Sequence, residues 1–311
     1  MLPTDFIFKD TTMRFFARLT ALMFSVLLSH WAHADALPSQ RLVSAGGAVT
    51  EWVVALGRES QLVGVDTTSQ HPESVRALPS IGYQRQLSSE GILSLRPDVL
   101  IGTEEAGPPP VIAQLRAAGV SVALLSARAD TAALDSNLRT LGKLLGNEHL
   151  AQQLSQQFTQ RIEAQHEWVA QAQQRQSAPG VLLVVSHAGS QPMVAGTGTA
   201  GDWLIEQAGG RNLATHTGYT VLSAEAITGL DPEVLVITDR AQIATPAREA
   251  LFRDNPLLAA SRAGRNGRVI ELDPTLLVGG LGPRLPDAVA ALANTFYPAR
   301  TPLTPGAKSN P

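Results

Sequence analysis

The chain has 311 residues, of which 44% are hydrophobic and 16% charged, so it can bury one large core or two ordinary ones and is neither disordered nor fibrous. Its formal net charge is −3 and it has no lysine- or arginine-rich run, which argues against nucleic acid as a partner. Because it has no cysteine, it can form no disulfide, no cysteine-ligated metal site and no lipid-modified N-terminal cysteine.

The N-terminal segment has the pattern of an export signal. Two arginines precede the apolar run 19–28, and small residues at 32–34 resemble a cleavage site. The apolar run is shorter than the roughly 20 residues of a membrane-spanning helix. We therefore expect a signal peptide over residues 1–34, with translation starting at Met1 or Met13, and a soluble mature protein in the bacterial periplasm.

After the signal, short apolar runs of strand length alternate with helical patterns. The runs 41–44 and 62–65 flank a helical pattern near 49–56. This βα repetition predicts a first α/β lobe over residues 35–130.

The middle of the chain is helical in character. Residues 131–178 are rich in Ala, Gln, Leu and Glu and predict one long helix or two abutting ones that link the first lobe to a second α/β lobe over 179–297. A stiff link of this kind restricts how far two lobes can close. The tail 298–311 is proline-rich and is predicted to be disordered.

The two lobes share an internal repeat. Residues 87–101 recur as 222–236 with eight of fifteen positions identical, and each copy follows a Gly-Tyr pair that contains Tyr83 or Tyr219. Each copy predicts a helix of about ten residues that ends at a proline, followed by a buried parallel strand. A cleft between two such lobes is where a ligand is expected.

One motif is typical of enzymes. Residues 196–201 match the dinucleotide fingerprint G-x-G-x-x-G, but only the short run 193–195 separates them from a proline, which favours a tight turn before a helix. No P-loop and no nucleophile elbow occurs. We expect no enzyme, and a secreted nucleotide-dependent enzyme that uses Gly196, Gly198 and Gly201 is the remote alternative.

Two side chains are candidates for binding chemistry. His187 ends the apolar run 181–186, and ligands meet open α/β folds at strand ends, although a structural or solvent-facing histidine fits the same position. Tyr83 fits an ordinary turn residue, but Arg85 two positions on can favour its phenolate, a hard anionic donor suited to ferric iron.

Two segments resemble a known family. Residues 82–93 are similar to the axial-ligand loop of the periplasmic haem-binding proteins of haem ABC importers, and residues 186–196 are similar to the opening of their second lobe. The resemblance covers residues 41–296. This family is a branch of the cobalamin and siderophore binding-protein class, so a siderophore or cobalamin carrier is the nearest alternative.

The resemblance implies a fold and a ligand site. The fold is that of class III periplasmic binding proteins: two Rossmann-like α/β lobes joined by a long helix, with ferric haem (iron protoporphyrin IX) in the interlobe cleft. Tyr83 would be an axial ligand of the iron, with Arg85 and Arg240 as supporting cations and His187 as a candidate second ligand. Whether one or two haems bind stays open.

Glu90 and Glu225 occupy the same place in the two repeat copies. Each follows a serine that can cap the helix, so each can be a helix N-terminal acid stabilised by the macrodipole. The resemblance implies a second role, docking against a homodimeric inner-membrane permease with its ATPase, supplied indirectly by an outer-membrane haem receptor.

Overall fold

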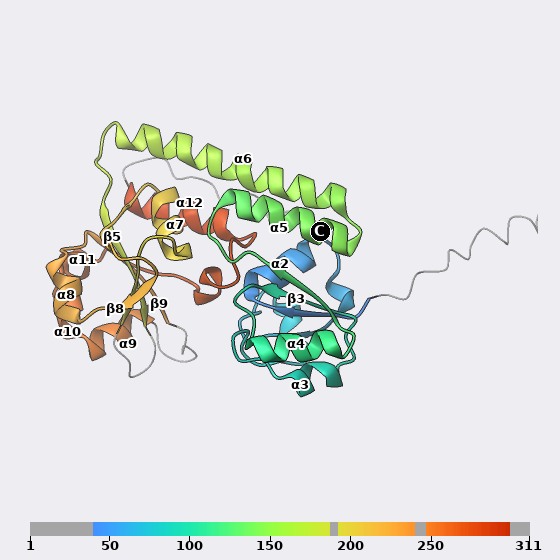
Figure 1. The fold of residues 1–311 in the computed structure, drawn as a ribbon. Helices are drawn as coiled ribbons and strands as arrows, with labels where there is room; N and C mark the ends of the chain where they lie inside the picture. The colour runs from blue at the N-terminus through green and yellow to red at the C-terminus, as the bar shows by residue number, and fades with distance from the viewer. Residues whose placement is uncertain (1–39, 187–191, 240–246, 299–311) are drawn as a thin grey trace, which may run out of the picture. The chain divides into compact units, whose positions relative to one another are not determined.

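The computed structural model describes most of the chain (Figure 1). The described residues are 40–186, 192–239 and 247–298. The predicted signal peptide over 1–34, the tail from 299 onward, His187 and Arg240 lie outside the described residues. Within the described ranges, no helix combines the length and the apolar character needed to cross a membrane.

The first part of the described chain forms a parallel sheet with helices between its strands. Its elements are β1 (Leu42–Ala45), α2 (Gly47–Ala55), η1 (Glu59–Gln61), β2 (Leu62–Val65), η2 (Glu73–Ala77), α3 (Ser89–Ser94), β3 (Val99–Thr103), α4 (Pro109–Ala117) and β4 (Ser121–Leu125). The strand order is β2-β1-β3-β4, and every neighbouring pair is parallel. Strands β1 and β3 are completely buried, as expected of apolar runs covered on both faces.

Two helices follow, α5 (Thr131–Leu145) and α6 (Glu148–Gln173). Asp130 caps α5 by accepting a hydrogen bond from the Ala133 amide at 2.7 Å, and Gly146 ends it in the left-handed region at φ +65°. Figure 1 shows α6 running along α5 and α12 (Leu285–Phe296), both of which it contacts. The buried positions of α6 recur every three or four residues, which gives the helix a single packed face.

The second sheet is mixed rather than purely parallel. Its region comprises β5 (Gly180–Ser186), β6 (Met193–Ala195), α7 (Ala200–Gln207), β7 (Arg211–Asn212), β8 (Tyr219–Val221), α8 (Ala224–Gly229), β9 (Val234–Asp239), α9 (Ala247–Asp254), α10 (Pro256–Ala259), α11 (Arg262–Arg265), β10 (Val269–Glu271) and η3 (Pro274–Leu277). The order is β10-β9-β5-β6-β8, with β7 paired to β5. Strands β5, β9 and β10 are parallel, whereas β6 runs antiparallel to β5 and β8. Sheets and helices together confirm the α/β class.

The repeat helices are shorter than expected. The prediction of about ten residues was wrong, because α3 and α8 have six residues each. Arg96 and Asp231 precede the two prolines, and the proline ring disfavours the helical region for the residue before it. Both residues instead take φ +47°, so the chain leaves the helix at equivalent points of the two copies.

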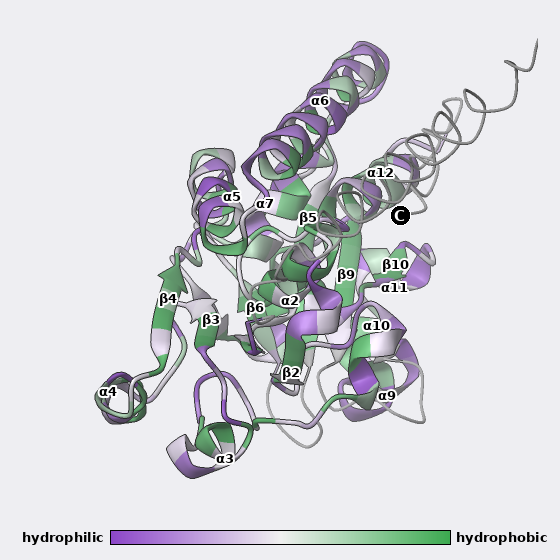
Figure 2. Ribbon diagram, turned by 90° about the vertical axis from the view of Figure 1, so that its right-hand side faces the viewer, coloured by the Kyte–Doolittle hydropathy of each residue, from purple (hydrophilic) through white to green (hydrophobic). Residues whose placement is uncertain are grey.

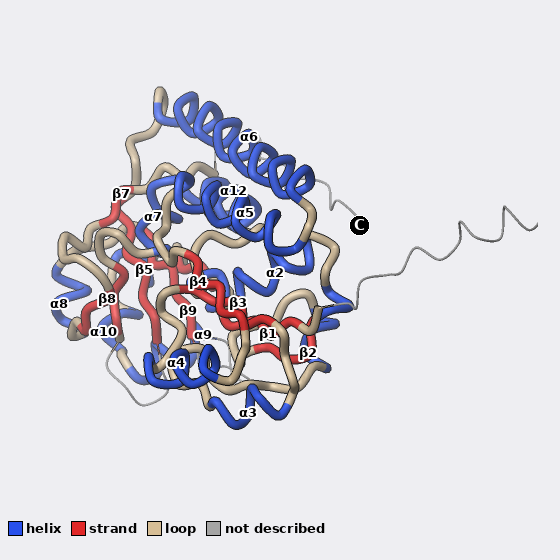
Figure 3. Tube along the Cα trace, turned by 45° about the vertical axis from the view of Figure 1, so that its right-hand side comes forward, coloured by secondary structure: helices blue, strands red, loops and turns tan. Residues whose placement is uncertain are grey.

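One hydrophobic cluster contains buried residues from both sheets and from α5 and α6. Trp52 of α2, Phe158 of α6 and Trp203 of α7 form a row with ring centroids 6.4 and 6.2 Å apart. Figure 2 shows the strands as hydrophobic and much of α6 as hydrophilic, and Figure 3 shows the strands of both sheets beneath the helical layer of α5, α6 and α12. Buried side chains of the two sheets therefore belong to one core.

Candidate functional site

A cavity of about 460 Å³ lies where loops from both sheets meet. Glu105 and Ala127 line it just after β3 and β4, and Val185 lines it near the end of β5. Ligands of open α/β folds bind at these carboxyl ends of the strands. The remaining lining residues are Tyr83, Gln84, Arg85, Met193, Gly198, Thr199, Ala200, Gly218, Tyr219, Leu277, Val278, Gly279 and Gly280.

Tyr83 belongs to a loop that backbone hydrogen bonds hold in place. Gly82 turns the chain at φ +87°, a conformation that glycine adopts without strain. The Gln86 amide donates to the Tyr83 carbonyl at 2.7 Å, and the Gly107 amide donates to the Gln84 carbonyl at 2.9 Å. On the other side of Tyr83 the Gly82 carbonyl accepts from the Thr67 amide at 2.9 Å, and because Gln84 is buried the loop is held on both sides of Tyr83. A ring on such a loop meets a ligand with little loss of entropy.

Arg85 has a partner that the sequence did not reveal. Its Nη2 donates to Glu105 Oε1 at 2.6 Å. This hydrogen bond, more than the charges of Tyr83 and Tyr219, raises the pKa of Arg85. The pair is half exposed, so it contributes little to stability. The site therefore brings together the expected Tyr83 and Arg85 with a carboxylate that competes for the guanidinium.

Sequence reasoning missed Glu105 and Tyr219 as members of this site. Glu105 follows the carboxyl end of a buried strand, where open α/β folds place functional side chains, and that position was an available signal. Tyr219 was visible as the counterpart of Tyr83 in the repeat, but no neighbouring charge marked it. Its hydroxyl is buried and its ring packs against the core.

The glycine-rich segment 196–201 forms the turn before α7, with Thr199 as the helix cap. The buried carboxylate of Asp202 accepts from the Gly198 amide at 3.0 Å and from Asn212 Nδ2 at 2.8 Å. A dinucleotide phosphate would need such amides at a helix N-terminus, and here an aspartate of the chain occupies one of them. The preceding strand, β6, is antiparallel, unlike the first strand of a nucleotide-binding unit.

Glu90 and Glu225 are exposed in the first turns of α3 and α8. Ser88 and Ser223 cap these helices by accepting hydrogen bonds from amides three residues on, at 3.4 and 3.2 Å. Hydrogen bonds from its own backbone and from Ser223 lower the pKa of Glu225. Both acids are therefore solvent-facing groups at equivalent points of the two repeats.

None of the histidines in the described residues is among those that line the cavity. His71 pairs with Asp273, His166 contacts Gln207, and His216 bonds a backbone carbonyl. Over residues 40–186, 192–239 and 247–298, no group of three or more His, Asp or Glu side chains is arranged to hold a metal ion. Of the two iron ligands expected from the sequence, Tyr83 lines the cavity and His187 lies outside the described residues.

Comparisons with known proteins place this architecture in a family. The periplasmic binding protein family model matches residues 42–276. The fold is similar to that of a periplasmic haem-binding protein from Pseudomonas aeruginosa, with 59% identity and a TM-score of 0.83 over 85% of this chain and 95% of that chain.

Two curated proteins are more distant relatives. The chain is 27% identical to the uncharacterized ABC transporter substrate-binding lipoprotein YvrC of Bacillus subtilis, over 83% of this chain and 80% of that protein. It is 24% identical to the vitamin B12-binding protein of Yersinia pestis (strain Pestoides F), over 69% and 75% respectively.

The architecture and the family match agree. Two α/β sheets share a helical layer, and loops from both sheets line the cavity. The matched region contains every described strand of both sheets. The prediction of a binding protein rather than an enzyme is confirmed, and the chain belongs to the periplasmic binding protein family.

Proposed function

We propose that this protein captures ferric haem in the periplasm and delivers it, chemically unchanged, to an ABC permease of the inner membrane. The observation that carries the proposal is the meeting of Tyr83 and Arg85 at the cavity. Identity of 59% to a haem-binding protein supports the same ligand.

Tyr83 supplies the bond to iron in this proposal. A phenolate is a hard anionic donor that ferric haem accepts as an axial ligand. Arg85 lines the same cavity, where its positive charge would stabilise an iron-bound phenolate. Before a ligand arrives, the guanidinium is hydrogen-bonded to Glu105.

The apolar part of the cavity lining suits a porphyrin. Val185, Met193, Leu277 and Val278 supply apolar contacts to a flat aromatic ligand. Burial contributes about 25 cal/mol per Å² of apolar area, so a porphyrin gains several kcal/mol before ordering costs are subtracted. Iron ligation then adds orientation and selectivity.

Two further residues complete the proposed site from outside the described residues. Arg240 follows β9 and is proposed as a second cation for the tyrosinate or the ligand. His187 follows β5 and is proposed as a candidate second iron ligand.

Delivery would use the matching acids of the two repeats. Glu90 and Glu225 would each meet a basic group on one subunit of a homodimeric permease that works with an ATPase. Charges at such a rim mainly set orientation and association rate. Haem would arrive from an outer-membrane receptor system, and the signal peptide over 1–34 would export the protein to the periplasm.

A parallel titration of three ligands tests the proposal. Mature protein is titrated with ferric haem, cobalamin and a ferric siderophore, with binding followed by visible absorption and stoichiometry by native mass spectrometry. We expect saturable haem binding with a high-spin ferric tyrosinate spectrum, and weak binding of the other two. Saturable binding of cobalamin or siderophore without haem binding would overturn the haem assignment. The mass of the complex would show whether one or two haems bind.

A further inference from the structure

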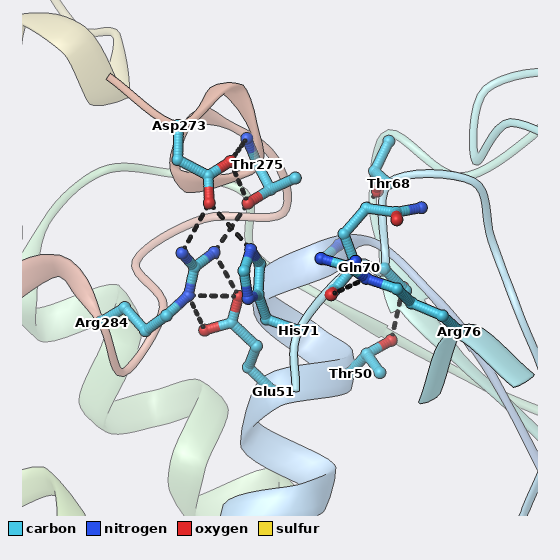
Figure 4. Close-up of polar contacts among 11 residues, drawn as sticks. Thr50, Glu51, Thr68, Gln70, His71, Arg76, Asp273, Thr275 and Arg284 are labelled. Atoms are coloured by element: carbon cyan, nitrogen blue, oxygen red, sulfur yellow. Dashed lines mark hydrogen bonds and ion pairs between the residues drawn. The ribbon is translucent and has the colours of Figure 1, made fainter. Parts of the chain in front are cut away.

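A charged cluster away from the cavity joins distant parts of the chain (Figure 4). Both carboxylate oxygens of Glu51 (α2) accept a hydrogen bond from Arg284 Nε at 3.0 Å. Glu51 Oε1 also accepts one from Arg284 Nη2 at 2.8 Å. Arg284 Nη1 donates to Asp273 at 2.8 Å, and Nη2 donates to the Thr275 hydroxyl at 2.7 Å. His71 Nε2 lies 2.9 Å from the same aspartate. Every nitrogen of the guanidinium therefore has a partner.

The cluster encloses a turn that forms part of the cavity wall. Residues 277–280 line the cavity and lie between Thr275 and Arg284, which are both held by the cluster. The Val278 carbonyl accepts a hydrogen bond from the Ala48 amide at 3.2 Å. The Leu281 carbonyl accepts one from Trp52 Nε1 at 2.8 Å. Two hydrogen bonds from α2 thus hold the turn.

The turn packs tightly against the start of α2. Gly279 takes φ +90°, and a Cβ built on it would lie 3.3 Å from the Ala48 nitrogen. A Cβ on Gly46 would lie 3.6 Å from the Gly279 Cα and 3.0 Å from Gln84 Oε1. Because Gln84 stands between Tyr83 and Arg85, close packing runs from the turn to the ligand loop.

The charged groups of the cluster are partly buried and hold one another in a fixed geometry. Glu51 is buried, and burial raises its pKa above the ordinary value although Arg284 pairs with it. For Asp273, burial acts in the same direction, but hydrogen bonds from Thr275 and Arg284 outweigh it and lower the pKa. A bidentate arginine fixes geometry that an apolar contact would leave adjustable.

We propose that Arg284 is a positioning residue for the ligand cavity: with Glu51 and Asp273 it holds the turn 277–280 against the start of α2 and so sets the wall beside the Tyr83 loop. This deepens the proposed function, on which the choice of haem as ligand rests. Arg284 itself does not line the cavity, so it acts through the turn.

The test compares two variants with a matched control. Arg284→Ala alone would leave Glu51 buried without its partner and could unfold the protein. The double variant Glu51→Gln/Arg284→Gln removes the charges of Glu51 and Arg284 together. Arg284→Lys keeps the positive charge but loses the planar guanidinium that donates to several partners at once. Arg161→Ala is the control, because it breaks the ion pair of Arg161 with Asp287 between α6 and α12, outside the cavity lining.

We expect the double variant to release bound haem to a scavenger protein about tenfold faster, with an unchanged absorption spectrum because Tyr83 is untouched. Arg284→Lys should fall between the wild type and the double variant, and Arg161→Ala should stay within about twofold of the wild type. Equal release rates in the double variant and the wild type, or an equal acceleration by Arg161→Ala, would overturn the proposal.

A second measurement does not depend on haem. In ligand-free protein, hydrogen exchange of the Ala48 amide should accelerate about tenfold in the double variant, while amides of β5 stay protected. Unchanged protection of Ala48 would contradict the positioning role. If the wild type bound no haem, the proposed ligand would fail, and the exchange result would still decide whether Arg284 holds the turn.

Discussion

The two copies of the internal repeat have the same local structure and different surroundings. Both contain a serine-capped six-residue helix followed by a pre-proline residue at φ +47°. In the first copy Tyr83 stands in an anchored loop beside Arg85 and Glu105. In the second, Tyr219 is the first residue of β8, pairs with β6 and packs against the core. The two copies therefore share their local structure, whereas the surroundings of the two tyrosines differ: Tyr83, the proposed iron donor, lies beside two charged groups, and Tyr219 lies in a strand.

The largest expected effect tests whether the copies contribute equally to the fold. Ile92 and Ile227 are equivalent and completely buried, each in its own cluster. Ile92→Ala and Ile227→Ala should each lower the free energy of unfolding by about 2–5 kcal/mol, as lost burial and a new cavity require. Urea unfolding measures this. A cost below about 1 kcal/mol in one copy would show that its helix packs loosely.

A smaller effect is expected at the helix caps. Ser88→Ala and Ser223→Ala each remove a side-chain acceptor for a helix amide. Each should lower the free energy of unfolding by about 1 kcal/mol, measured in the same urea experiment. The matched Ser→Thr variants keep the hydroxyl and serve as controls. Unequal costs of the two alanine variants would break the local equivalence of the copies.

Glu105→Gln sharpens the difference between the tyrosines. It removes the negative charge that holds Arg85 at 2.6 Å but keeps an acceptor oxygen, so more of the positive charge of Arg85 would act on the iron-bound Tyr83. Because the pair is half exposed, we expect haem affinity to rise only about threefold. Absorption titration measures the change, with Arg161→Ala, outside the cavity lining, as the control. A fall in affinity would show that Glu105 helps hold the ligand.

The smallest effect concerns docking. Glu90 and Glu225 are exposed at the starts of their helices, so Glu90→Gln and Glu225→Gln should leave haem binding unchanged. Each should weaken stimulation of the permease ATPase in proteoliposomes about threefold, and by the same factor if docking is two-fold symmetric. An effect of only one variant would contradict a symmetric interface.

Local sequence patterns predicted the α/β class, a helical region after residue 130 of either one long helix or two abutting ones, and the capped starts of the repeat helices. They overestimated the length of the repeat helices, because an apolar pattern does not show that the residue before the proline leaves the helical region. They also missed the antiparallel β6 and the pair of Glu51 and Arg284, which lie 233 positions apart. Contacts of that separation depend on the packing of whole lobes, which residue periodicity does not specify.

The most direct test of the central claim is ferric haem titration of Tyr83→Phe beside Tyr219→Phe, which removes the same hydroxyl from each copy. We expect Tyr83→Phe to lose the tyrosinate absorption and about a hundredfold in affinity, as loss of an axial ligand implies, and Tyr219→Phe to keep the spectrum with at most about a threefold loss. A wild-type spectrum in Tyr83→Phe, or its loss in Tyr219→Phe, would contradict the assignment of the iron donor to the first copy.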